Sequence, residues 1–417
     1  MLLNRTITYE HHKKNFLLLL WQSFFFMLTI NILDKDTVLP GLLKHLGANE
    51  TYIGLLSMIT IGLPKLSQIF FGQSVSKHQT RKRHLINGFL VRFSSLLVLG
   101  FTLWNYYLYR IDSTTTIILI FLFYTIYSLA AAYTSVSIVD LAPRCIFYDK
   151  LKKFYSLKQV ANSLSIFVAV FIVRKFLQVF PYPLNYSVIH FLAAGATLIS
   201  TLALFGIYER IVFTKPKENI REFFRHVYKE LSTNRNLLLF ALIVNSEGLF
   251  LSIVPFFTTY AMKNLGIDYK VIGTLFLWKI IGVLTSSLIL FLHKNFSYKK
   301  ALFFNNAIAF AMTLFIVFFH GDIVFYKIIF FLVGVFNSLY RITYEGVIVE
   351  LSDDKNRAMY VSIIGSSNIS TLIVPVLFGS FTMLVGYKVS FVISALLLSF
   401  AFLFLSKLKL NLSLRGY

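Results

Sequence analysis

The sequence predicts an all-α polytopic membrane protein in which twelve transmembrane helices form two six-helix halves. Its composition is the first reason: of 417 residues, 57% are hydrophobic and 14% are charged, whereas soluble domains carry about 25% charged residues. The second reason is the spacing of apolar stretches, twelve of which reach the roughly 20 residues needed to cross a bilayer. The third is the distribution of positive charge between these stretches.

The apolar stretches define the spans in order along the chain. The first follows a basic N-terminal segment, as the apolar part of a signal peptide would. It is long and has no small-residue cleavage site, so we expect it to be retained as a helix. The spans are expected at residues 16–38, 51–74, 85–107, 115–138, 157–179, 186–208, 236–260, 268–292, 300–319, 324–347, 358–382 and 386–406.

Glycine and proline interrupt some of these spans. Gly62 and Pro64 fall inside the second span, Pro255 inside the seventh, and Pro375 with Gly379 inside the eleventh. Breaks of this kind are tolerated where neighbouring helices or a cavity satisfy the freed backbone groups. They are therefore expected at helix–helix contacts or beside a central site.

Positive charge alternates along the chain. Of the 40 Lys and Arg residues, 27 lie in every second gap between spans or within a few residues of it, and nine lie in or within a few residues of the intervening gaps. This positive-inside pattern predicts both termini in the cytosol, with the protein in a cytoplasmic membrane. The net charge of +22 would suggest nucleic acid in a soluble protein. Here it is spread over short loops beside apolar spans, so the expected partner is the anionic inner leaflet.

The longest gap divides the chain into predicted halves at residues 1–208 and 236–417. Within the linker at 209–235, apolar residues recur at helical spacing, with basic residues on the other face. We expect an amphipathic helix lying in the inner headgroup layer, with a regulatory docking site as the alternative. Its apolar positions are Ile220, Phe223, Phe224, Val227 and Leu231.

A loop motif follows the second span. It reads Gly72-Gln-Ser-Val-Ser76-Lys77 and is followed by Arg81-Lys82-Arg83. Together with the six-plus-six spans, it resembles the signature loop of the major facilitator superfamily of secondary transporters. Further segments resemble a bacterial branch of that superfamily: Thr37-Val-Leu-Pro40, Tyr52-Ile-Gly-Leu55 and the stretch from Glu350 to Tyr360.

The resemblance implies two related halves and a latch near this loop. Ser76 takes the place of the usual aspartate, so the latch is expected to be weaker or to be supplied by Asp140 and Arg144. Arg341 and Glu345, spaced i, i+4, would form a local ion pair or take part in gating. The gating candidates are Gly72, Lys77, Arg81, Asp140, Arg144, Glu345 and Arg357.

Charged residues inside spans are the strongest functional candidates, because burying a charge in a bilayer is costly. Four basic residues lie well inside spans, away from the span ends: Lys65, Arg92, Lys279 and Arg341. Glu247, in the seventh span, is proposed as the coupling carboxylate with Lys279 as its partner. A static ion pair between the two is the alternative. We expect Arg92 to reach the inner surface or Asp140.

The other candidates are polar or aromatic residues on helices that line the cavity in the resembled family. Asp34 and Asp36 stand at the outer end of the first span, near Lys35. Asp34 is expected to belong to a solvated helix end, with a place at the outer mouth as the alternative. The candidates for the substrate cavity are Gln22, Asn31, Lys65, Asn245, Asn337, Arg341 and Tyr344.

These features predict a secondary active transporter that moves a small molecule by alternating access, as a monomer. A proton or sodium gradient supplies the energy and no cofactor or metal is expected; the sequence has no Walker loop for ATP hydrolysis. Export is favoured because polar cavity candidates are few. The alternatives are a polytopic enzyme of polysaccharide or lipid synthesis, which the short external gaps disfavour, and a sensor on the same fold.

Overall fold

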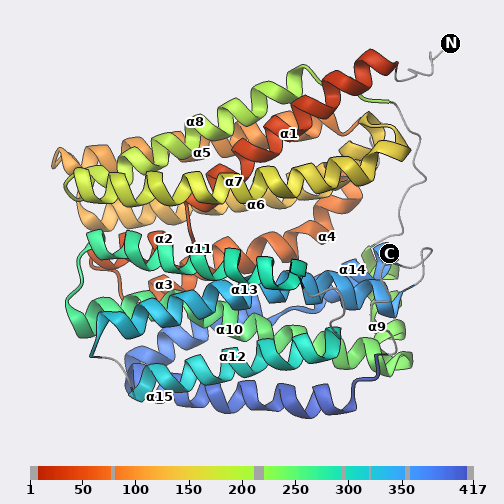
Figure 1. Ribbon diagram of the computed structural model, residues 1–417. Helices are drawn as coiled ribbons and strands as arrows, with labels where there is room; N and C mark the ends of the chain where they lie inside the picture. Colours follow the sequence, from red (N-terminus) through yellow and green to blue (C-terminus); the bar gives the residue numbers. More distant parts are fainter. Residues whose placement is uncertain are drawn as a thin grey trace. The chain divides into compact units, whose positions relative to one another are not determined.

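The computed structural model describes residues 8–76, 80–210, 220–292, 297–318, 321–352 and 357–410. All the secondary-structure elements in these ranges are helices, which confirms the all-α class. Contacts divide the chain into two compact units (Figure 1). Unit 1 comprises residues 1–34 and 63–220, and unit 2 comprises residues 35–62 and 221–417.

Unit 1 is a bundle of long helices packed side by side. The most extensive pairs join α5 to α8 and α6, and α1 to α7 and α8. Leu19, Phe89 and Phe154 belong to its core. Its helices are α1 (Tyr9–Ile32), α4 (Leu63–Ser76), α5 (Lys82–Tyr107), α6 (Ser113–Cys145), α7 (Tyr148–Val179) and α8 (Leu184–Phe205).

Unit 2 combines a short helical segment from early in the chain with the C-terminal helices. Its early elements are α2 (Val38–His45), α3 (Glu50–Ser57) and η1 (Met58–Gly62), the last a single π-helical turn. The later helices are α9 (Ile220–Thr233), α10 (Arg235–Leu265), α11 (Tyr269–Leu292), α12 (Tyr298–Phe318), α13 (Ile323–Leu351), α14 (Arg357–Ser367) and α15 (Ser370–Lys407).

Ten segments of the described chain are long and apolar enough to cross a membrane. The second predicted span is not one of them, because it is broken into α3, η1 and α4. The eleventh and twelfth predicted spans fall together in one segment, Ile363–Lys407. Inside it, Gly386 has a non-helical backbone with φ of 85°. The ten segments therefore do not correspond one to one with the twelve predicted spans.

Polar side chains begin several helices where the sequence has short polar residues. Asp112 accepts hydrogen bonds from the N–H groups of Thr114 and Thr115 at the start of α6. Asn234 accepts one from Leu237 at the start of α10. These caps satisfy N–H groups that have no partner within the helix.

Glycines allow α3 and η1 to pack closely against α15. A methyl group at Gly54 would overlap the carbonyl oxygen of Pro375, and one at Gly379 would overlap that of Glu50. Gly62, at the end of the π-helical turn, lies equally close to Thr371. Backbones approach this closely only where side chains are absent. The interruptions at Gly62 and Gly379 therefore coincide with a helix–helix contact, as expected.

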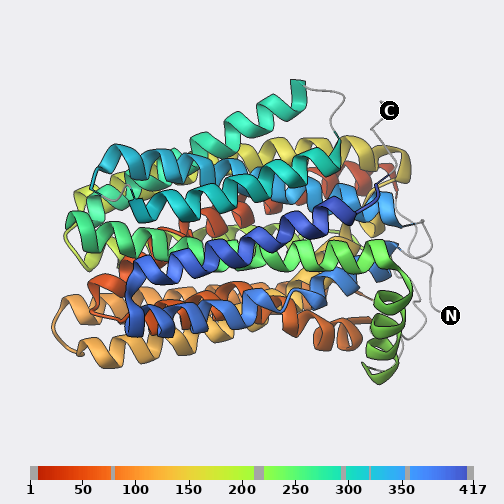
Figure 2. The same ribbon diagram turned by 90° about the horizontal axis from the view of Figure 1, so that it is seen from below.

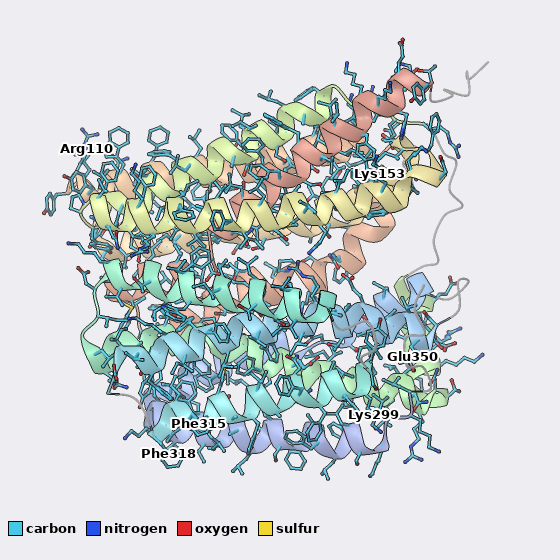
Figure 3. All side chains as sticks on the ribbon, viewed as in Figure 1. Arg110, Lys153, Lys299, Phe315, Phe318 and Glu350 are labelled. Atoms are coloured by element: carbon cyan, nitrogen blue, oxygen red, sulfur yellow. The ribbon has the colours of Figure 1, made fainter. Side chains whose placement is uncertain are left out.

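The predicted loop alternation is visible within each unit. In unit 1, Arg110 and Lys153 lie at opposite ends of the bundle (Figure 3). In unit 2, Lys299 and Glu350 lie at the end away from Phe318 (Figure 3). Successive gaps therefore alternate between the two ends of each unit. We call the end of unit 2 that carries Lys299 its basic end.

The linker helix α9 crosses the basic end of unit 2, roughly perpendicular to the long helices (Figure 2). Val227 and Leu231 pack against a buried core cluster that includes Phe240 and Leu302. The amide of Asn234 donates to the hydroxyl of Tyr360 at 3.2 Å. These two apolar residues of the predicted amphipathic face therefore contact protein.

Candidate functional site

The central feature of unit 2 is a buried carboxylate on α10. Glu247 is fully buried, and the amide nitrogen of Asn305 on α12 donates to its Oε1 at 2.7 Å. Glu247 Oε2 has no hydrogen-bond partner within the described part of the chain, and neither has Asn305 Oδ1. Among the described residues Glu247 is therefore held by a neutral amide, with spare hydrogen-bonding capacity beside it.

A helix break lies against the same stretch of α10. The helical backbone stops after Ser367 at the end of α14 and resumes at Ser370 in α15. The Asn245 side chain holds both ends of this break. Its amide donates to the carbonyl of Ser367 at 2.8 Å, and its oxygen accepts from the N–H of Ser370 at 3.2 Å. Asn245, a predicted cavity residue, thus satisfies backbone groups that the break leaves open.

Glu247 and the break are neighbours. A methyl group at Gly248 would overlap Asn368 Oδ1, so α10 approaches the non-helical residues directly. Asn368 is buried and its Nδ2 has no partner among the described residues. Aromatic side chains adjoin this region: Phe250 contacts Phe336, which stacks on Tyr340. Unit 2 therefore brings together the Glu247 carboxylate, the side-chain amides of Asn305 and Asn368, each with an atom that has no described hydrogen-bond partner, and aromatic side chains.

Lys279 pairs with an acid other than the one that we predicted. Its ammonium lies 2.6 Å from Asp36 Oδ2, and both side chains are buried. Asp34 is 8% exposed and Asp36 2%, so the solvated helix end expected here is wrong. The Asp36 carbonyl also accepts a hydrogen bond from Thr258 on α10 at 2.7 Å. The segment after α1 is thereby joined to α10 and α11.

A second polar network lies beside α3. Lys44 contacts Glu50 at 2.7 Å, and Tyr387 of α15 donates to the same Glu50 oxygen at 3.0 Å. The network therefore joins α2, α3 and α15.

In unit 1, two predicted gating residues meet at an acid that sequence reasoning missed. Glu209 accepts hydrogen bonds from the backbone N–H groups of Arg81 and Lys82, at 2.7 and 2.9 Å. Arg144 Nη1 lies 3.7 Å from the same carboxylate. A carboxylate at the N-terminus of α5 is also favoured by the helix dipole. The one available signal was the position of Glu209 directly after the sixth span.

Arg92 is 3% exposed, inside unit 1. Its guanidinium lies 4.7 Å from the ring centre of Phe26 and 4.5 Å from that of Tyr127. It also donates to the Tyr127 hydroxyl. Aromatic faces attract such a cation and partly replace its hydration. The expected route to Asp140 is not described, because the Asp140 side chain lies outside the described residues.

The other predicted site residues are scattered over both units. Gln22 is buried and its backbone carbonyl accepts from the Ser200 hydroxyl, while the Asn31 side chain donates to the backbone carbonyl of Met27 in its own helix. Lys65, Asn337 and Tyr344 are half-buried. Arg341 and Glu345 are exposed, and their described side chains form no ion pair. Lys77, the Arg357 side chain and the surroundings of Gly72 lie outside the described part of the chain.

Asn305 was not predicted because the resemblance places the uncharged polar residues of the cavity on helices one, four, seven and ten. Asn305 lies in the ninth predicted span, where the pair Asn305-Asn306 in an apolar stretch was the available signal. A metal site has no support in the described chain, where no three His, Cys, Asp or Glu side chains cluster.

The chain belongs to the major facilitator superfamily. The family model described as Major Facilitator Superfamily matches residues 19–344, most of the chain. This confirms the resemblance drawn from the loop motif. Membership identifies the chain as a membrane transporter rather than an enzyme. No curated protein shows a significant match.

Solved structures of transporters share this fold. The nucleoside transporter NupG matches at a TM-score of 0.70 and 13% identity, over 95% of this chain and 99% of that one. A POT family transporter in complex with a thioalcohol-conjugated peptide matches at 0.72 and 10%, over 94% and 96%. A bacterial homologue of the human lysosomal transporter Spinster matches at 0.66 and 10%, over 95% and 97%. At these identities the similarity defines the fold alone.

Proposed function

We propose that this protein is a gradient-driven secondary transporter in which Glu247 is the coupling carboxylate. The observation that carries the proposal is that Glu247 is fully buried and accepts a hydrogen bond from the neutral amide of Asn305. An ionised carboxylate closed off from water without a counter-ion costs several kcal/mol. The group therefore takes up a proton or a cation whenever its site closes, which is the property a coupling residue needs.

The substrate is proposed to bind beside the break between α14 and α15. Broken helices near a transporter's centre expose backbone groups that bind polar parts of substrates. Here Asn368 has an amide with no partner among the described residues, next to Glu247. Tyr340 contacts both Phe336 and Tyr344, and this aromatic surface would contact the apolar part. We favour a small, partly apolar solute and its export.

The Asp36–Lys279 pair is proposed as a gate. By sequence Asp36 belongs to the predicted first half and Lys279 to the second, yet their ion pair is buried within unit 2. In alternating access the two six-helix halves, 1–208 and 236–417, rock against each other around the site. That motion would break and re-form the ion pair. The free energy needed to separate the two charges would be offset by substrate or ion binding.

We also propose twelve crossings with both termini in the cytosol. Counting α3, η1 and α4 as one span and dividing α15 at Gly386 adds two crossings to the ten apolar segments. The basic end of unit 2 would then face the cytosol, as the positive-inside rule predicts. A bacterial cytoplasmic membrane and a monomer are part of this proposal.

The test is solute flux with the Glu247→Gln variant in sealed proteoliposomes. The probes are radiolabelled nucleosides, small peptides and fluorescent apolar dyes, the first two because structural neighbours transport or bind them. Glutamine keeps an oxygen to accept from Asn305 but cannot release a proton. We expect uncoupler-sensitive accumulation to fall at least about tenfold, with counterflow exchange within about twofold of wild type.

The matched control is Glu10→Gln, which removes an exposed carboxylate at the start of α1. It should leave both activities unchanged. If Glu247→Gln loses exchange and accumulation equally while remaining folded, Glu247 has a role in binding and not in coupling. If wild-type protein moves no probe across the panel, the transport proposal fails for these solute classes.

A further inference from the structure

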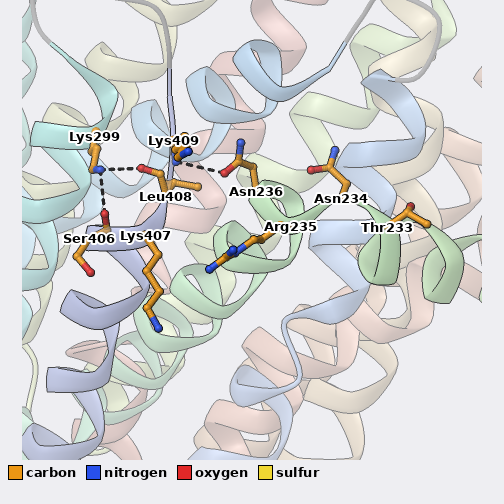
Figure 4. A pocket seen from close by; sticks show the side chains of 9 residues that line it. All are labelled: Thr233, Asn234, Arg235, Asn236, Lys299, Ser406, Lys407, Leu408 and Lys409. Atoms are coloured by element: carbon orange, nitrogen blue, oxygen red, sulfur yellow. Dashed lines mark hydrogen bonds between the residues drawn. The ribbon is translucent and has the colours of Figure 1, made fainter.

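A pocket of 730 Å³ opens at the basic end of unit 2 (Figure 4). The start of α10, the start of α12 and the end of α15 form its wall. Its lining contains four basic side chains and no acidic one: Arg235, Lys299, Lys407 and Lys409. The other lining residues are Thr233, Asn234, Asn236, Ser406 and Leu408.

Polar contacts hold the wall of this pocket in place. Lys299 donates to the carbonyl of Leu408 at 2.6 Å, and the Lys409 N–H donates to Asn236 Oδ1 at 3.2 Å. The residues after α15 are thus tied to the starts of α10 and α12. The carbonyls that end α15 receive a cation in return, which also suits the helix dipole.

The positive charge of the pocket is not neutralised by the described part of the protein. The side chains of Arg235, Lys407 and Lys409 form no ion pair with a described residue. In Figure 4 the Arg235 and Lys407 side chains extend to the same side of the pocket. Like charges gathered around one cavity repel each other, so an anion placed there is stabilised by all of them. Lysine and arginine together are the common ligands of phosphate groups.

Apolar side chains continue from the cations along the same helices. Phe303 lies one turn from Lys299 on α12 and is 55% exposed. Leu403 lies one turn from Lys407 on α15 and is 56% exposed, followed by Phe400 a turn further. Positions four apart lie on one helix face. Basic side chains lie at the helix ends, and exposed apolar side chains lie further along the same helices. This arrangement is complementary to a phospholipid, whose charged headgroup is followed by apolar acyl chains.

We infer that this pocket binds the phosphate headgroup of an anionic phospholipid of the leaflet at the basic end. Free phosphate shares the same chemistry, but the exposed apolar side chains next to the cations favour the lipid. The bound lipid tethers the starts of α10 and α12 and the end of α15 to the membrane surface. The site is separate from Glu247 and does not depend on the substrate.

The test measures lipid binding to delipidated full-length protein in neutral detergent. The probes are short-chain phosphatidylglycerol, short-chain phosphatidylcholine and inorganic phosphate, each titrated while the thermal unfolding midpoint is followed. We expect phosphatidylglycerol to bind at least about tenfold more tightly than either other probe. The variant Arg235→Gln/Lys407→Gln/Lys409→Gln should lose at least about tenfold in that affinity.

The matched control variant is Arg110→Gln/Arg174→Gln/Lys175→Gln, which removes the same charge from exposed residues of unit 1. It should bind phosphatidylglycerol like wild type. An equal loss in both variants would mean that net charge, and not this pocket, attracts the lipid. Phosphate binding as tight as that of phosphatidylglycerol would overturn the lipid assignment. Size-exclusion profiles and helical content of both variants check that they fold.

Discussion

At the scale of single residues, the buried partners of Glu247 and Lys279 give these two charged residues different roles. Sequence reasoning selected both because each is a charge in an apolar span. The structure gives Glu247 an amide, Asn305, and gives Lys279 a carboxylate, Asp36. A buried carboxylate without an opposing charge is suited to changing its ionisation, whereas a buried ion pair is suited to holding two segments together. The two residues therefore have different proposed roles.

Lys279→Met should destabilise the protein by about 3–5 kcal/mol, because it leaves the Asp36 carboxylate buried and unpaired. Adding Asp36→Asn to this variant should restore much of the loss, since neither charge of the pair then remains buried. The measurement is the unfolding free energy of the purified protein in detergent. Lys44→Met, which breaks the more exposed pair with Glu50, should cost less. A double variant as unstable as Lys279→Met would show that the pair is not the cause.

Among the elements, the second predicted span differs most from its expected form. A single helix was expected over 51–74, with Gly62 and Pro64 as local breaks. The structure divides this stretch into α3, the π-helical turn η1 and α4. The reason is the close approach of α15, which contacts the chain at Gly54 and Gly62. The sequence shows the glycines at these positions, but it does not show that α15 is the helix that packs against them.

Gly54→Ala should destabilise the protein by about 1–3 kcal/mol, because the added methyl group overlaps the Pro375 carbonyl and α15 must shift. This outcome opposes helix propensity, which favours alanine over glycine by about 1 kcal/mol. Gly195→Ala is the matched control, since Gly195 in α8 has open space around its Cβ position. Unfolding in detergent measures both. Equal stability of the two variants would contradict close packing at Gly54.

At the scale of the whole molecule, the alternation of basic gaps carries the proposed topology. Arg110 and Lys153 lie in successive gaps and at opposite ends of unit 1 (Figure 3). The positive-inside rule assigns Lys153 to the cytosol and Arg110 to the outer side. This orientation is defined by the side of the membrane that each loop faces, so it is tested in intact cells.

Single-cysteine labelling checks this orientation. Cys145 is the sole cysteine in the sequence and is buried, so Cys145→Ser provides a background without thiols. In that background a membrane-impermeant maleimide should label Arg110→Cys in intact cells. It should label Lys153→Cys only after the membrane is permeabilised. Both positions are exposed, so access to the thiol is not limited by protein. Labelling of both from one side would contradict the topology.

The sequence by itself determined the all-α class, the approximate limits of most helices and the superfamily. These depend on local properties: apolar length, the alternation of basic gaps and a contiguous loop motif. Only the tertiary structure decided which polar side chains meet. Asp36 and Lys279 are 243 positions apart, and Glu247 and Asn305 are 58 apart. Such contacts arise from how separate helices pack, and the periodicity of one helix shows which face is apolar without identifying the residue opposite.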